Sequence, residues 1–167
     1  MELKAIIANL EKYNNGHFIG EWVSFPVSEA EIAKVFYRIG INGNYAEYFI
    51  AGYEGIWSGE IKNEYISIEW LNSVAEHLQK FDENILSAAL ECWTLYDVLE
   101  MRPDDLRIHT GIRNEYDLGR KFIKESGFCA IGSIAEHFIC ECLGSRIVNK
   151  TNGGFTSHGF IEYVGEY

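Results

Sequence analysis

The chain has 167 residues, 25 acidic against 14 basic side chains and a net charge of −11, and 47% of its residues are apolar. That apolar share excludes a disordered acidic tail, and no apolar run approaches the ~20 residues that a membrane-spanning helix needs. The first residues lack the basic and apolar regions of a signal peptide, so we expect a cytoplasmic protein without membrane contact. The four cysteines show no disulfide-framework spacing and are expected to be reduced.

The acidic charge is concentrated in the first part of the chain. Residues 1–100 hold 16 acidic and 6 basic residues, a balance of −10, whereas residues 101–167 hold 9 and 8, a balance of −1. Such an acidic surface would repel DNA, because nucleic-acid binders need Lys and Arg to displace phosphate counterions. It suits a basic partner instead. Solubility alone explains the same acidity, so the charge by itself leaves both interpretations open.

The first predicted segment, residues 1–62, begins with a β-hairpin. Strands are expected over 4–10 and 17–25, and Tyr13-Asn14-Asn15-Gly16 between them is typical of a turn, because Asn and Gly tolerate a positive φ. A helix over 29–39 and a strand over 45–53 complete a small three-stranded antiparallel sheet with one helix.

The second predicted segment, residues 63–103, is a helical middle part, and the third, residues 104–167, is mixed. The apolar spacing of the middle part predicts helix over 68–85 with a break at 82–84, then a short helix that Pro103 terminates. In the third segment we expect strands over 106–109, 145–148 and 155–163, helices over 115–126 and 134–143, and a turn over 149–154. The order of elements predicts an α+β fold.

Capping residues mark where these helices begin and end. Three pairs have the spacing of a capping box, which satisfies the first backbone N–H groups of a helix: Ser28 with Glu31, Thr94 with Asp97, and Ser133 with Glu136. Glycines are expected to end three helices, because glycine readily adopts the left-handed conformation found there: Gly40, Gly127 and Gly144.

Several phrases of the sequence resemble the ArdA antirestriction proteins. They are Ile7-Ala8-Asn9-Leu10-Glu11-Lys12-Tyr13-Asn14-Asn15-Gly16 with Gly20-Glu21-Trp22, then residues 47–55, 116–120 and 154–163. The resemblance covers nearly the whole chain. It implies an elongated, three-part protein that mimics the charge and shape of B-form DNA. It also implies an inhibitor of type I restriction–modification enzymes, which occupies the DNA-binding cleft formed by their methyltransferase and specificity subunits. An enzymatic activity, a cofactor and direct nucleic-acid binding are not implied.

The resemblance gives the exposed carboxylates a role as substitutes for DNA phosphates. The candidates are the acidic residues of the second half of the first segment and of the middle segment: Glu47, Glu54, Glu60, Glu64, Glu69, Glu76, Asp82, Glu83, Glu91, Asp97 and Glu100. Within them, Glu69, Glu76 and Glu83 are seven residues apart and would line one side of a continuous helix. Four cations interrupt this acidic part and would dilute the mimicry: Lys12, Lys34, Arg38 and Lys62.

The resemblance also implies a homodimer joined through the third segment. The near-neutral charge of that segment fits an interface, because two strongly acidic faces would repel each other. We expect the contact on Ile134, Phe138 and Ile139. Burial of the same side chains inside one chain explains their apolar character equally well.

The sequence offers little for catalysis or metal binding. Cys140 and Cys142 lie two apart on a predicted helix and so point to different sides, and His137 nearby adds no second ligand pair. His17, His77, His109 and His158 are scattered, and no nucleotide-binding or hydrolase motif is present. We therefore expect no metal, no cofactor and no enzyme.

Two alternatives stay open. An acidic adaptor with the same fold would bind another basic DNA-binding protein or regulator, and a small hydrolase or metal protein would bring a histidine next to Cys or Asp side chains. Among the aromatic residues, Trp57 lies in a glycine-containing loop and is either a contact residue or part of the core.

Overall fold

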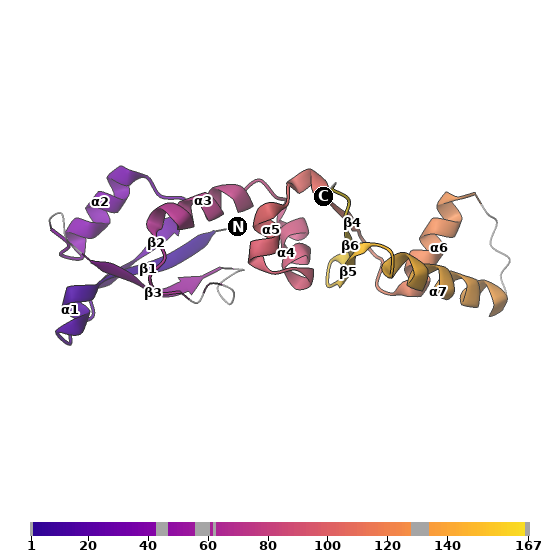
Figure 1. Ribbon diagram of the computed structural model, residues 1–167, viewed down its shortest axis with the longest axis horizontal. Coiled ribbons are helices and arrows are strands. Elements are labelled where there is room, and N and C mark those ends of the chain that lie inside the picture. The colour runs from indigo at the N-terminus through magenta and orange to yellow at the C-terminus, as the bar shows by residue number, and fades with distance from the viewer. Residues whose placement is uncertain (1, 43–46, 56–60, 62, 128–133, 166–167) are drawn as a thin grey trace. The chain divides into compact units, whose positions relative to one another are not determined.

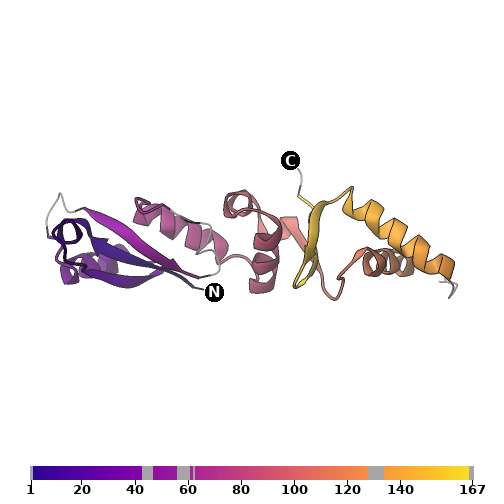
Figure 2. The ribbon, with the colours of Figure 1, turned by 90° about the horizontal axis from the view of Figure 1, so that it is seen from below.

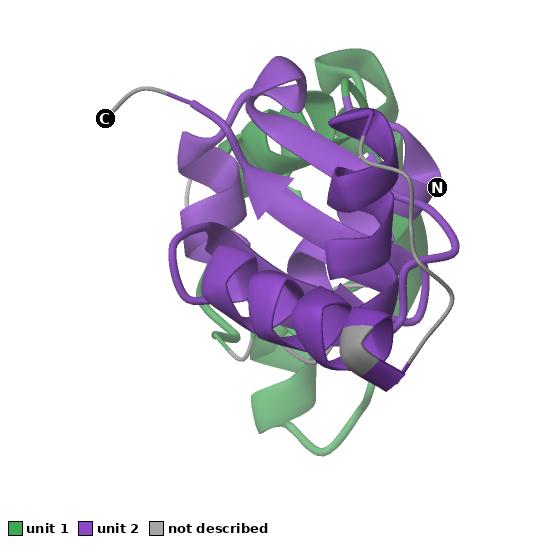
Figure 3. Ribbon diagram, turned by 90° about the vertical axis from the view of Figure 1, so that its right-hand side faces the viewer, with its two compact units in different colours: residues 1–80 green, residues 81–167 purple. Residues whose placement is uncertain are grey.

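A computed structural model describes residues 2–42, 47–55, 61, 63–127 and 134–165. The chain forms two compact units, residues 1–80 and 81–167, which are distinguished by colour in Figure 3. The boundary falls within the predicted middle segment, and the division into three segments remains a prediction. The described residues contain two three-stranded antiparallel sheets and seven α-helices, so the predicted α+β fold is confirmed.

The first unit is built on an antiparallel sheet with the strand order β2-β1-β3 (Figure 1). Its strands are β1 (Leu3–Asn9), β2 (Gly20–Phe25) and β3 (Tyr48–Glu54). β1 alternates in burial over Leu3, Ala5 and Ile7, as expected for a strand with one face on the core. The three predicted strands are therefore confirmed with small changes at their ends.

The connection between β1 and β2 differs from the predicted tight turn. It contains a short helix, α1 (Leu10–Asn14), whose N-cap Asn9 accepts a hydrogen bond from the backbone N–H of Lys12 at 2.9 Å. Gly16 has a φ of 82°, so the expected positive φ is present, but it follows the helix. Asn9, which precedes the predicted turn, starts this helix because its side chain caps the first helical turn.

Two longer helices complete the first unit: α2 (Glu29–Arg38) and α3 (Ile68–Leu78). Figure 1 shows both on the same side of the sheet. The side chain of Ser28 accepts a hydrogen bond from the backbone N–H of Glu31, as its position before α2 predicts. The side-chain amide of Asn72 in α3 accepts a hydrogen bond from the backbone N–H of Val27 at 2.8 Å and donates one to the carbonyl of Val27 at 2.9 Å. These two bonds hold α3 against the residues just before α2.

The second unit begins with two short helices, α4 (Glu83–Cys92) and α5 (Leu95–Glu100). The predicted break at 82–84 is confirmed, because Asp82 is the N-cap of α4 and accepts hydrogen bonds from the next turn. The capping box of Thr94 and Asp97 is also confirmed. A 3-10 turn, η1 (Pro103–Asp105), follows where Pro103 prevents continuation of the helix.

A second antiparallel sheet has the strand order β4-β6-β5. Its strands are β4 (Leu106–His109), β5 (Asn152–Thr156) and β6 (Gly159–Tyr163). The single strand predicted over 155–163 is wrong, because residues 157 and 158 form the turn of a hairpin. The turn predicted over 149–154 is also wrong in its second half, where Asn152-Gly153-Gly154 pairs with β6.

The last two helices, α6 (Glu115–Glu125) and α7 (Ile134–Val148), lie side by side (Figure 2). The strand predicted over 145–148 is wrong, because α7 continues through Gly144 to Val148. Gly144 does not end the helix; it lies against the backbone of Glu115, where any side chain would collide. Gly127 follows α6 with a φ of 74°, as predicted. Ser133, the predicted cap of α7, lies outside the described residues.

Among the helices that the structure describes, none combines the length and the apolar character needed to cross a bilayer.

Candidate functional site

All of the predicted phosphate-mimicking carboxylates that the structure describes are exposed. These ten residues, called the mimic carboxylates below, are Glu47, Glu54, Glu64, Glu69, Glu76, Asp82, Glu83, Glu91, Asp97 and Glu100. Glu60, the eleventh candidate, and Trp57, the candidate aromatic contact, lie outside the described residues.

In the first unit, the mimic carboxylates lie at the ends of β3, in the loop before α3 and on α3. Glu47 precedes β3, Glu54 is its last residue, and Glu64 lies in the loop before α3. Glu69 and Glu76 lie on the exposed face of α3, because Leu71, Val74, Ala75 and Leu78 turn the opposite face into the core. The apolar spacing of α3 thus determines that these two carboxylates face outward.

In the second unit, three mimic carboxylates also accept hydrogen bonds from nearby backbone or hydroxyl groups and so stabilise the local fold. Asp82 caps α4, and Asp97 accepts hydrogen bonds from the backbone N–H and the hydroxyl of Thr94, at 3.0 and 2.6 Å. Glu91 accepts hydrogen bonds from the hydroxyl and the backbone N–H of Ser157, at 2.5 and 2.8 Å. These bonds lower the pKa of Glu91 and of Asp97, so both carboxyls stay ionised.

None of the mimic carboxylates forms an ion pair with a cation among the described residues. The cations of the first unit that form ion pairs are held by other carboxylates. Arg38 binds Glu21 through two bonds, Nε–Oε2 at 2.9 Å and one terminal nitrogen–Oε1 at 2.7 Å, and reaches Glu31 at 3.2 Å. Lys34 also pairs with Glu31, at 2.9 Å.

This pairing changes the role expected for two of the interrupting cations. Arg38 lowers the pKa of Glu21, and Lys34 followed by Arg38 lowers that of Glu31. Arg38 and Lys34 are thus neutralised by carboxylates outside the mimic set. Lys62 lies outside the described residues. The mimic carboxylates of the first unit keep their charge available for an external cation.

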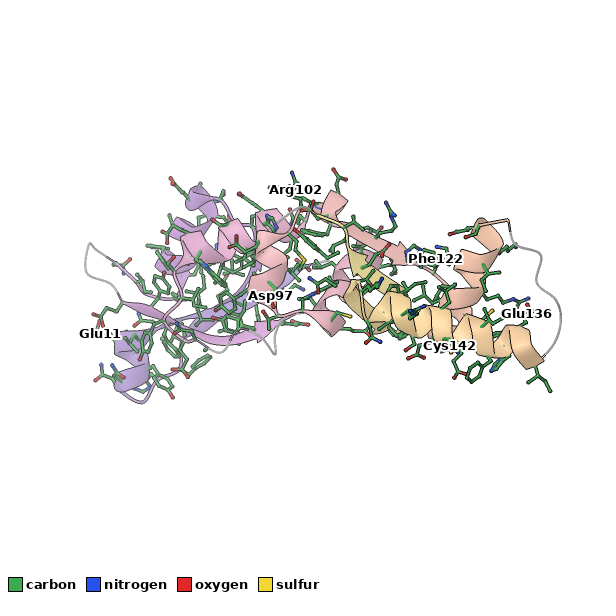
Figure 4. The ribbon with its side chains drawn as sticks, turned by 45° about the vertical axis from the view of Figure 1, so that its right-hand side comes forward. Glu11, Asp97, Arg102, Phe122, Glu136 and Cys142 are labelled. Atoms are coloured by element: carbon green, nitrogen blue, oxygen red, sulfur yellow. The ribbon has the colours of Figure 1, made fainter. Side chains whose placement is uncertain are left out.

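Sequence reasoning missed a second group of exposed carboxylates without an ion pair in the described part of the chain: Glu11, Glu29, Asp104 and Glu141. Figure 4 labels Glu11 on α1. Glu11 and Glu29 lie in the first turn of a helix, where an acidic residue has an ordinary structural explanation in the helix dipole. Their exposure could have been inferred from the same helical spacing that placed Glu69 and Glu76.

Two of the histidines, His109 and His158, form hydrogen bonds with polar side chains in the described part of the chain. His109 is bonded through Nε2 to Glu162 at 2.9 Å and through Nδ1 to Lys121, and His158 Nε2 is 3.1 Å from the hydroxyl of Ser87. No group of three His, Cys, Asp or Glu side chains in the described part of the chain could hold a metal ion.

The two cysteines of α7 face different sides of the helix, as predicted. Cys140 is buried and Cys142 is exposed, and both are free thiols. Burial raises the pKa of the Cys140 thiol, so it stays protonated and unreactive. His137, the nearby histidine, packs against the ring of Tyr116 with a centroid distance of 4.4 Å.

The predicted dimer residues are exposed on α7. Ile134 is 92% exposed, Phe138 68% and Ile139 57%. The alternative that these side chains fill the core of a single chain therefore does not apply to them. Large apolar side chains gathered in this way on one helix are typical of an interaction surface.

A family model described as antirestriction protein (ArdA) matches residues 5–162 of the chain. None of the curated proteins compared with the chain matches it.

Proposed function

Because the chain belongs to the ArdA family of antirestriction proteins, we propose that it inhibits type I restriction–modification enzymes as a mimic of B-form DNA. Family membership gives the chain an antirestriction function in general terms. The finer proposal is that the mimic carboxylates occupy the DNA-binding cleft of the methyltransferase and specificity subunits. The chain acts there without catalysis and without a cofactor.

One observation supports this mechanism above the others: the mimic carboxylates are exposed, and none has an ion pair among the described residues. A DNA-binding cleft presents Lys and Arg side chains that normally neutralise phosphates. Carboxylates already paired within the chain could not replace those phosphates. Carboxylates without a cation partner in the described residues can, because no ion pair there has to break when the enzyme binds.

The spacing on α3 fits the same idea. Glu69 and Glu76 lie seven residues apart on one exposed face, which corresponds to about 10 Å along the helix axis. Successive phosphates of one DNA strand advance by about 3.4 Å along the DNA axis. The rise from Glu69 to Glu76 along the helix axis is therefore close to the rise of three base steps along the DNA axis. Because the cleft reads backbone charge before base identity, such a mimic does not depend on the sequence that the enzyme recognises.

The proposal includes a homodimer that joins through α7. Ile134, Phe138 and Ile139 supply an exposed apolar surface on a segment of nearly balanced charge. Two copies would present two sets of mimic carboxylates to one long cleft.

The test is competition with DNA for a type I methyltransferase core composed of methyltransferase and specificity subunits. The E69Q/E76Q variant should compete about 2- to 30-fold more weakly than the wild-type chain, since each exposed charge contact contributes about 0.2–1 kcal/mol. Competition by the wild-type chain should weaken as salt rises.

The matched control is E125Q/E141Q, which changes the formal charge equally on α6 and α7. It should compete almost as well as the wild-type chain. Equal weakening by both variants would mean that net charge alone acts, and unchanged competition by E69Q/E76Q would remove α3 from the mechanism. A wild-type chain that binds another basic protein of the host but not the methyltransferase core would favour an acidic adaptor.

A further inference from the structure

The second unit contains a pocket whose charge is opposite to that of the protein as a whole. Its volume is about 630 Å³, which lies within the range of about 300–1,000 Å³ that is usual for small-molecule sites. Three cationic side chains line it: Arg107 from β4, Arg146 from α7 and Lys150 just after α7.

Two of these cations have no partner in the described part of the chain. Neither Arg146 nor Lys150 forms an ion pair there, and Arg107 reaches only Glu162, at 3.9 Å. Glu162 is itself nearly buried and lies closer to His109, at 2.9 Å. The pocket therefore has one carboxylate, which is bonded to His109 and paired with Arg107, and two cations without an ion pair in the described residues.

Stabilisation of the helix end explains this arrangement only in part. Two of the last four carbonyls of α7, those of Ser145 and Ile147, already accept hydrogen bonds from the backbone N–H groups of Asn149, Lys150 and Thr151. Basic residues near a helix C-terminus favour its dipole. That effect covers Arg146 and Lys150, but it does not apply to Arg107, which comes from a strand.

Apart from Thr151, the rest of the pocket lining is apolar. Phe122 from α6, labelled in Figure 4, and Leu143 and Ile147 from α7 are each partly exposed and contribute to its wall. An inorganic anion would use the cations alone and leave these side chains in water. A ligand with an apolar body would cover them and gain about 25 cal/mol per Å² of apolar surface removed from water.

We propose that this pocket binds a small amphiphilic anion. The ligand has an apolar, preferably aromatic, body against Phe122, Leu143 and Ile147, and one carboxylate, sulfonate or phosphate group held by Arg107, Arg146 and Lys150. Guanidinium groups suit such a headgroup, because they can donate two parallel hydrogen bonds to its oxygens. This site is independent of the mimic carboxylates.

The first experiment titrates the full chain with 8-anilinonaphthalene-1-sulfonate, an aromatic sulfonate, and follows backbone amide shifts by NMR. Shifts confined to residues around Arg107, Ile147 and Val164 are expected. Shifts centred on Ile134 and Phe138 instead would overturn the proposal, because the dye would then be binding the exposed face of α7. Nile red, an uncharged apolar dye, should bind at least about tenfold more weakly; equal binding would mean that the cations take no part.

The second experiment compares two charge-matched variants with the same sulfonate probe. R146Q/K150Q removes two pocket cations, whereas R113Q/K124Q removes two exposed cations of the same unit that do not line the pocket. The dissociation constant should rise about tenfold or more in R146Q/K150Q and change less than about twofold in R113Q/K124Q. Equal weakening by both variants, or none by R146Q/K150Q, would contradict the proposal.

Discussion

Gly144 of α7 packs against Glu115 of α6 with no space for a side chain between the two backbones. A Cβ atom placed on Gly144 would lie 1.7 Å from the carbonyl oxygen of Glu115. Gly119 of α6 makes the reciprocal approach, since its Cβ would lie 1.8 Å from the carbonyl oxygen of Cys140. These two glycines set the distance between the helices.

The first prediction concerns Gly144→Ala. Helix propensity alone would make alanine stabilising by about 0.5–1 kcal/mol. Here the clash is with backbone, which cannot move aside, so we expect a loss of about 1–3 kcal/mol. Urea unfolding gives the loss, and hydrogen exchange of α6 and α7 amides locates it. Gly52→Ala is the control, because its nearest neighbour would be a side-chain atom at 3.7 Å. An unchanged stability of Gly144→Ala would show that the helices separate at no cost.

The second prediction concerns Asn9, which is only 3% exposed. Its side chain accepts a hydrogen bond from the backbone N–H of Lys12 and donates one to the carbonyl of Ile39 at 3.1 Å. Asn9→Ala removes both and leaves polar backbone groups without these partners, so the first unit should lose about 1–3 kcal/mol.

Asn15→Ala is the matched control for that experiment. It removes a hydrogen bond of similar length, to the carbonyl of Glu11, but in an exposed position. It should cost less than about 0.5 kcal/mol, and thermal unfolding of the two variants measures the difference. Equal losses would mean that the burial of Asn9 has no energetic consequence.

The third prediction concerns acid unfolding through Asp105. Hydrogen bonds from the side chain of Arg102 and from its backbone N–H lower the pKa of Asp105 below its ordinary value of 3.8. A carboxyl with a lowered pKa contributes stability that is complete above its unfolded pKa and is lost as the pH falls through its folded pKa. Asp105→Asn should therefore be less stable than the wild-type chain at neutral pH, and the gap should narrow below about pH 4.

Urea unfolding midpoints between neutral and acidic pH measure this gap. Asp104→Asn provides the control, because Asp104 is exposed and has no ion pair in the described part of the chain. Its gap from the wild-type chain should stay small throughout. A gap for Asp105→Asn that is as large in acid as at neutral pH would show that the charge of Asp105 is not what stabilises η1.

The fourth prediction concerns the proposed dimer. The F138E/I139E variant places two like charges on each α7 surface, so the dimer dissociation constant should rise about tenfold or more while the fold is kept. Sedimentation velocity over a range of concentrations measures it. Tyr37→Glu, at a site that is 76% exposed on α2, should leave the dimer unchanged. A variant with unchanged association would place the interface elsewhere.

Features that depend on neighbouring residues were predictable from the sequence. Ser28 and Thr94 cap the helices that follow them, and Gly127 ends α6, because each interaction joins residues only a few positions apart. The exposure of Glu69 and Glu76 was equally predictable, since the spacing of the buried residues in α3 leaves them on the other face.

The sequence by itself determined the α+β character, most helix and strand positions and the family, because these follow from local patterns. The tertiary structure decided which glycine ends a helix. A glycine at position 144 is expected to terminate α7, yet Gly144 lies inside the helix, where its backbone contacts Glu115, 29 positions earlier in the sequence. The tertiary structure also decided which carboxylates remain unpaired, because Arg38 reaches Glu21 across 17 residues. Such contacts depend on where the folded chain brings distant residues together, which local spacing does not record.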